Sequence, residues 1–153
     1  MASPDDQAVA AHDQTTTIHL KEHIQAHEPR TTDPHYALFM AAKRRIQAAG
    51  LMKCCIPDCT FPGPMELHHD KVEFSEQGGV DLAKFNEFYG LHLASDEDFK
   101  AYIEGEGNLE VLCPTHHRTR LGIHELPGPF WNALRIWKDN LPPPAEVVTG
   151  ANT

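Results

Sequence analysis

Apolar residues recur every three or four positions in residues 33–50, which is the spacing of one face of an amphipathic helix. Asp33 is a suitable N-cap, Pro34 fits the first turn, and Gly50 fits the C-terminal stop. The sequence therefore predicts a helix here, with an apolar face formed by Tyr36, Phe39, Met40 and Ile46.

Two segments alternate in the manner of strands, "MELHHDKVEF" at 65–74 and "NLEVLC" at 108–113. Between them, residues 81–91 and 95–107 predict two short helices. In the second, Ser95 is the expected N-cap, and the expected buried side chains are Phe99, Tyr102 and Ile103. The chain thus predicts an α+β domain.

After the second strand, residues 114–120 predict a helix that opens at Pro114. Residues 127–140 predict a last helix, with Phe130, Leu134 and Trp137 on one face.

The length of 153 residues suits one domain with tails, placed at 33–141 between a polar arm at 1–32 and a tail at 142–153. In the arm, His19, His23 and His27 recur every four residues, a spacing that can bind metal on a helix, although a solvated arm is the favoured interpretation. No apolar run is long enough for a membrane span or a signal peptide, so we expect a cytoplasmic protein without a membrane partner.

The net charge of −9 argues against a generic basic nucleic-acid binder, but this charge is uneven. Residues 66–112 sum to −9, whereas residues 36–65 sum to +3 and residues 113–153 to +1. The segments around the cysteines are mildly basic and could meet a phosphate backbone.

The cysteines and one histidine form two short-spaced pairs far apart in the sequence. Either Cys54 or Cys55 pairs with Cys59, and Cys113 is followed after two residues by His116. Tetrahedral zinc sites are assembled from two such pairs, and zinc would stabilise a small, proline-rich domain. Free buried thiols are the alternative.

The sequence contains, in this order, "CCIPDC", "LHH", "NLEVLCPTHH" and the continuation "HHRTRLGIHELPGPFW". Together these motifs resemble the HNH endonucleases over roughly residues 50–131. They look most like the zinc-stapled HNH proteins of actinobacteria and their phages. The resemblance implies a small ββα-metal core stapled by structural Zn²⁺, with flanking helices and a helical insertion at 70–107.

The resemblance also implies residue roles. His68 and His117 correspond to ligands of a catalytic divalent ion (Mg²⁺, Mn²⁺, Ni²⁺ or Zn²⁺), His69 to the general base, and Asn108 to the residue that holds the loop and orients the base. The implied structural zinc ligands, with Cys54 favoured over Cys55, are Cys54, Cys59, Cys113 and His116.

Three further residues are open to two interpretations. His124, seven residues after His117, is either a third ligand of the catalytic ion, if the helix ends early near Gly122, or a surface residue. Arg118 and Arg120 either bind substrate phosphates or form a solvated basic turn.

The function implied by the resemblance is metal-dependent hydrolysis of DNA phosphodiester bonds, leaving 5′-phosphate ends, in a phage or mobile-element context and thus in a host cytoplasm. The acidic insertion at 70–107 could cover the site, repel non-substrates or bind a protein partner. One alternative is a zinc-stapled binding or assembly module without nuclease activity. Another is a redox or zinc-storage protein, supported only by the eleven histidines.

Adjacent residues of a strand point to opposite faces, so His68 and His69 would diverge in a regular strand. We therefore expect the chain to bend or the strand to end at this pair.

Overall fold

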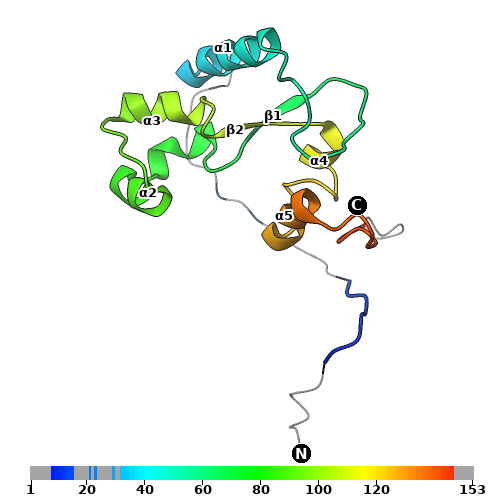
Figure 1. Ribbon diagram of the computed structural model, residues 1–153. Coiled ribbons are helices and arrows are strands. Elements are labelled where there is room, and N and C mark those ends of the chain that lie inside the picture. The colour runs from blue at the N-terminus through cyan, green and yellow to red at the C-terminus, as the bar shows by residue number, and fades with distance from the viewer. Residues whose placement is uncertain (1–7, 16–20, 22, 24–28, 30–31, 147–153) are drawn as a thin grey trace, which may run out of the picture.

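A two-stranded antiparallel sheet forms the centre of the computed structural model, which describes residues 8–15, 21, 23, 29 and 32–146. Strand β1 (Glu66–His69) pairs with β2 (Leu109–Leu112), with Glu66 opposite Leu112 and His69 opposite Leu109. Helices surround this sheet (Figure 1), so the expected α+β class is confirmed. The stripe of His19, His23 and His27 lies outside the described residues, except for His23.

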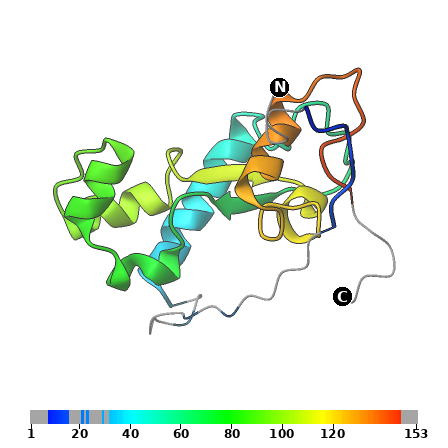
Figure 2. The same cartoon turned by 90° about the horizontal axis from the view of Figure 1, so that it is seen from below.

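Helix α1 (Pro34–Ala48) covers one face of the sheet (Figures 1 and 2). Its Ala42 packs with Leu67 and Leu109 of the two strands, and Phe39 and Ile46 lie against this cluster. The side chain of Asp33 accepts a hydrogen bond from the backbone N–H of His35, as expected of an N-cap. Gly50 has a φ of +71°, a conformation that glycine adopts without steric cost.

The other face carries α4 (Pro114–Arg118), which packs on both strands. The short helix α5 (Gly128–Ile136) brings Trp131 into a cluster with Ile56 and Leu112. Leu134 lies against this cluster as predicted, but the predicted positions of Phe130 and Trp137 are wrong. Both are largely exposed, at 48% and 43%, whereas Trp131 is 5% exposed.

The helical periodicity stops before Trp137, which explains the error at that residue. Helix α5 ends at Ile136, and Trp137 has extended backbone angles (φ −71°, ψ 149°). Phe130 lies in the first turn, where it points away from the core, and the next residue takes the buried position.

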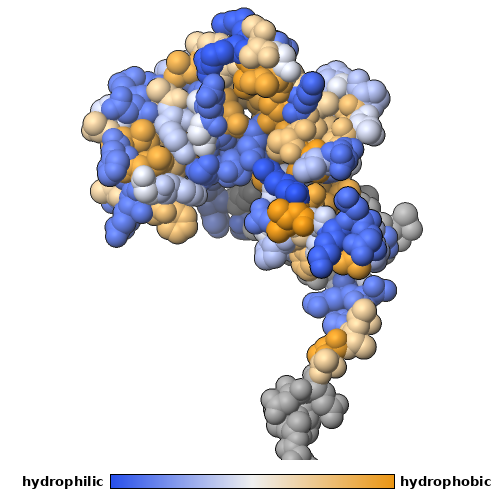
Figure 3. Space-filling view, viewed as in Figure 1, coloured by the Kyte–Doolittle hydropathy of each residue, from blue (hydrophilic) through white to orange (hydrophobic). Residues whose placement is uncertain are grey.

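The insertion at 70–107 forms a helical unit beside the sheet with a core of its own (Figure 1). It contains the 3₁₀ helix η2 (Phe74–Gly79), α2 (Leu82–Tyr89) and α3 (Asp96–Ile103), around the buried side chains of Val72, Phe85, Phe99 and Ile103. The side chain of Ser95 caps α3, as predicted. On the face shown in Figure 3, hydrophilic and hydrophobic residues are interspersed over this unit, so its apolar residues form no continuous layer there.

The first strand is shorter than the predicted 65–74 because it ends at His69. The N–H of Asp70 still donates to the backbone oxygen of Asn108, which continues the register of the ladder, and the chain bends from Asp70 onward. The strand therefore ends directly after the histidine pair, but His68 and His69 both lie in regular register, so their side chains still point to opposite faces. Within the part of the chain that the structure describes, no helix has the length and apolar character to cross a bilayer.

Candidate metal centres and active site

Three cysteines and one histidine converge where the loop before β1 meets the start of α4. Their ligand atoms, from Cys54, Cys59, Cys113 and His116, all lie within 4.8 Å of one another. The sulfurs of Cys59 and Cys113 are 3.8 Å apart, and Nδ1 of His116 lies 3.2 Å from the sulfur of Cys113 and 3.5 Å from that of Cys54. A tetrahedral zinc ion with Zn–S bonds of about 2.3 Å has edges of about 3.5–3.8 Å, so this group could hold zinc.

Of the two neighbouring cysteines, Cys54 belongs to this cluster. The sulfur of Cys55 lies instead 3.5 Å from a guanidinium nitrogen of Arg135. Burial, together with the sulfurs of Cys54 and Cys113, raises the pKa of Cys59 to about 11. Sulfurs packed this closely repel one another as thiolates, and a bound cation would remove that penalty.

Three histidines form a second cluster on the α4 side of the sheet. One ring nitrogen from each of His68, His117 and His124 lies within 4.8 Å of the others. His68 is 5% exposed, and neither of its ring nitrogens has a hydrogen-bond partner. Burial, and then the neighbouring His124 and His117, lower the pKa of His68 to about 4. A neutral, buried imidazole without a hydrogen bond is a suitable metal ligand, so the residues fit a divalent ion.

The sharp turn after α4 explains why His124 reaches this cluster. Helix α4 ends at Arg118, and the chain folds back so that the N–H of Ile123 donates to the backbone oxygen of His116. A Cβ at Gly122 would lie 2.7 Å from the backbone carbon of His117. Only glycine allows this approach, which returns His124 to the side of His117.

A carboxylate orients the ring of His117. Oε2 of Glu66 accepts a hydrogen bond of 2.6 Å from Nδ1 of His117, which leaves Nε2 for a ligand. Glu66 also pairs with Arg118, at 2.6 Å from a guanidinium nitrogen. Partial burial alone would raise the pKa of Glu66, but the hydrogen bonds from His117 and Arg118 hold it below its usual range.

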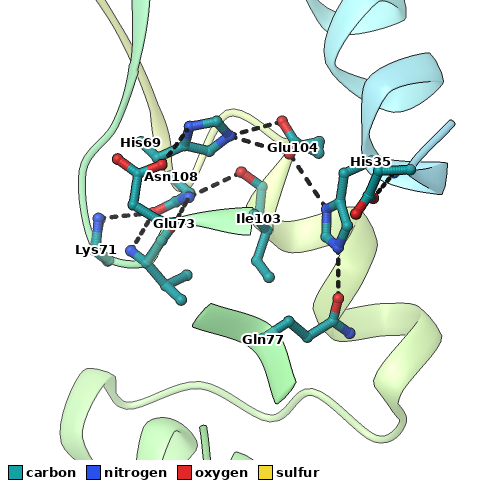
Figure 4. A network of polar contacts seen from close by, with 10 residues as sticks. His35, His69, Lys71, Glu73, Gln77, Ile103, Glu104 and Asn108 are labelled. Carbon is teal, nitrogen blue, oxygen red and sulfur yellow. Dashed lines mark hydrogen bonds and ion pairs between the residues drawn. The ribbon is translucent and has the colours of Figure 1, made fainter. Parts of the chain in front are cut away.

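His69 points to the opposite face, toward α1, where its ring stacks on Phe39. Its Nε2 lies 2.9 and 3.1 Å from the two oxygens of Glu104, and its Nδ1 lies 3.3 Å from Oε2 of Glu73 (Figure 4). Burial alone would lower the pKa of His69, but these two carboxylates raise it to about 9.

Glu73 connects the surroundings of the two neighbouring histidines. Its pKa is held below the usual range, because the hydrogen bond with His69 and the nearby His68 and His124 outweigh the effect of burial. Glu73, just beyond the end of the strand, therefore interacts electrostatically with histidines on both faces of β1.

The side chain of Asn108 is fully buried and makes four hydrogen bonds to backbone groups. Its oxygen accepts from the N–H groups of Lys71 and Val72, and its amide nitrogen donates to the carbonyls of Val72 and Ile103 (Figure 4). Asn108 thus ties the loop after β1 to the end of α3, with three bonds to the loop backbone, one to α3 and none of these four to His69.

The structure brings together every predicted ligand, but the sequence reasoning missed the carboxylates Glu66, Glu73 and Glu104 and the buried His35. No motif marks them: the partners of Glu66, Glu104 and His35 lie far away in the sequence, whereas Glu73 lies four residues after its partner His69. Glu104 alone carries a signal. It caps the C-terminus of α3, where the helix dipole disfavours a negative charge, so another group must stabilise it.

Comparisons with known proteins gave no match of significance among protein-family models, curated proteins or solved structures.

Proposed function

We propose that this chain is a metal-dependent endonuclease of the HNH type that hydrolyses phosphodiester bonds of DNA. The observation that carries the proposal is the cluster of His68, His117 and His124; His69 follows His68 on β1 but faces α1. His68 is buried and neither of its ring nitrogens has a partner, which is costly unless they bind something. With the half-buried His117 and the exposed His124 next to it, a divalent ion is the ligand that this set of nitrogens favours.

In the proposed site, His68, His117 and His124 hold the ion, and Glu66 keeps Nε2 of His117 turned toward it. The ion, when bound, would neutralise charge on the scissile phosphate and stabilise the leaving oxygen. The zinc cluster fixes the start of α4, and neighbouring residues of that helix then serve two sites: His116 turns to the sulfurs and His117 to the histidine cluster.

His69 is the proposed general base that takes a proton from the attacking water. Its Nε2 is occupied by Glu104, so Nδ1 is the nitrogen left for the proton. Glu73 lies 3.3 Å from this atom, and its side chain is 37% exposed, which allows it to turn into solvent when substrate enters.

Two arginines next to the histidine cluster are the proposed DNA contacts. The side chain of Arg118 is 64% exposed although it pairs with Glu66, so it can reach a phosphate from this position. Arg120 lies in the turn that returns the chain to His124. The segments around the cysteines are only weakly basic in sequence, which favours low sequence specificity or delivery to DNA by a partner protein. We further propose that the protein acts in a host cytoplasm, in a phage or mobile-element context.

Nicking of supercoiled plasmid tests this function. The zinc-loaded protein is incubated with Mg²⁺, Mn²⁺ or Ni²⁺, and with EDTA. His69→Ala should abolish metal-dependent nicking, whereas His92→Ala, at an exposed histidine of the insertion, should leave it unchanged. Wild-type protein that nicks with none of these ions would favour the alternative, a zinc-stapled binding or assembly module.

A further inference from the structure

Glu104 is a buried carboxylate that the insertion supplies to the sheet. It is the C-cap of α3, and its side chain is 1% exposed. A buried carboxylate is costly unless hydrogen-bonded and paired, and a helix C-terminus adds to the cost. The contacts of this carboxylate must therefore offset the cost of burying it.

Two histidines contact this carboxylate from different elements (Figure 4). Both of its oxygens lie within 3.1 Å of Nε2 of His69, and Oε1 lies 3.3 Å from Nδ1 of His35 on α1. Gln77 of η2 contacts Nε2 of His35 and donates to the backbone oxygen of Asp96. The carboxylate that meets His69 is thus also contacted by His35, which Gln77 holds in place.

We propose that Glu104 is the positioning residue for His69 in the proposed nuclease site, and that orienting the base is a role of the insertion. This inference rests on the proposed function. Asn108 is the residue expected to orient the base, but its four side-chain hydrogen bonds go to backbone groups of the loop after β1 and of α3.

The geometry fixes two properties of the His69 ring. A carboxylate only accepts hydrogen bonds, so the Nε2 bound to Glu104 carries a proton. Nδ1 becomes the proton acceptor of the neutral ring once Glu73, which lies 3.3 Å from it, has turned away. The ring also cannot turn about its χ2 angle without breaking this bond, while Phe39 stacks on its face. Glu104 thereby selects both the tautomer and the orientation that a base needs.

A double-mutant cycle on plasmid nicking tests the assignment. Glu104→Ala should lower kcat on the order of 10- to 100-fold with KM nearly unchanged, as for other residues that orient a reacting group. In a His69→Ala background the same change should cost nothing further, because Glu104 acts through His69. Glu104→Gln keeps an acceptor for Nε2–H and should retain more activity than the alanine variant.

A loss that is equally large with and without His69 would overturn the assignment, as would an unchanged kcat in Glu104→Ala. Ile103→Val is the matched control, because Ile103 is fully buried beside Glu104 and its side chain packs in the hydrophobic core of the insertion. It should lower stability and leave kcat unchanged.

A spectroscopic readout separates this inference from the nuclease proposal. In zinc-loaded protein, the Nε2 proton of His69 should give a downfield NMR resonance that disappears in His69→Ala and in Glu104→Ala but persists in Glu104→Gln. Inactive wild-type protein that shows this behaviour overturns the nuclease proposal alone. A resonance that survives in Glu104→Ala overturns the assignment to Glu104, whatever the activity.

Discussion

Replacing Asn108 by alanine should strongly destabilise the protein, because its side chain satisfies four backbone groups. Water can replace it at the N–H of Lys71, which is exposed. The N–H and the carbonyl of Val72 and the carbonyl of Ile103 are buried and would lose their partners. At about 1–3 kcal/mol for each of these three buried groups, the free energy of unfolding should fall by about 3–9 kcal/mol.

Urea unfolding at a fixed zinc concentration measures this loss. Asn86→Ala is the matched control, since this amide also bridges backbone groups of the insertion but makes only two hydrogen bonds, both with Leu93. It should cost about 1–2 kcal/mol, because Leu93 is only partly buried. An Asn108 variant that is no less stable than the Asn86 variant would show that the buried hydrogen bonds of Asn108 do not stabilise the fold as expected. An Asn108 variant that is unfolded without urea agrees with it.

Three more predictions concern the two metal clusters and the base. Purified wild-type protein should contain bound zinc in metal analysis, and the Cys113→Ser variant should lose both this zinc and cooperative thermal unfolding. A folded wild-type protein without zinc would contradict the assignment of the cysteine cluster as a zinc site. Gly122→Ala should weaken Mn²⁺ or Ni²⁺ binding to zinc-loaded protein in calorimetry, because the new Cβ pushes His124 away; unchanged affinity would exclude His124 as a ligand. Glu73→Gln should keep kcat within about a factor of three of wild type, because Glu73 leaves His69 before reaction; a tenfold loss would show that Glu73 takes part.

Local sequence signals predicted much of the fold. Asp33, Ser95 and Pro114 begin helices where expected, because capping depends on residues within one turn. The spacing of the two zinc-ligand pairs also predicted which side chains converge. In contrast, the spacing of Cys54 and Cys55 left the fourth ligand open, and the structure distinguishes them by placing Cys54 beside His116 and Cys55 beside Arg135.

The long-range contacts of the site could not be predicted from the sequence. Glu104 meets His69 across 35 residues and Glu66 meets His117 across 51, and no periodic pattern encodes either pair. Which turn of α5 is buried depended on where that helix ends, so Trp131 was missed. The role of the acidic insertion also required the structure, because the position of Glu104 at the end of α3 indicates that it needs a partner but not which residue that partner is.

The proposed function requires that His69, on the α1 face of β1, acts as the base in a site whose ion would be held by His68, His117 and His124 on the other face. The most direct test is the single-turnover rate of plasmid nicking at saturating Mn²⁺, for wild type and His69→Ala at equal zinc content. The account predicts metal-dependent nicking by wild type and a rate about 10²- to 10⁴-fold lower for the variant, which is the range for loss of a general base. Equal rates for the two proteins, or no nicking by wild type, would contradict it.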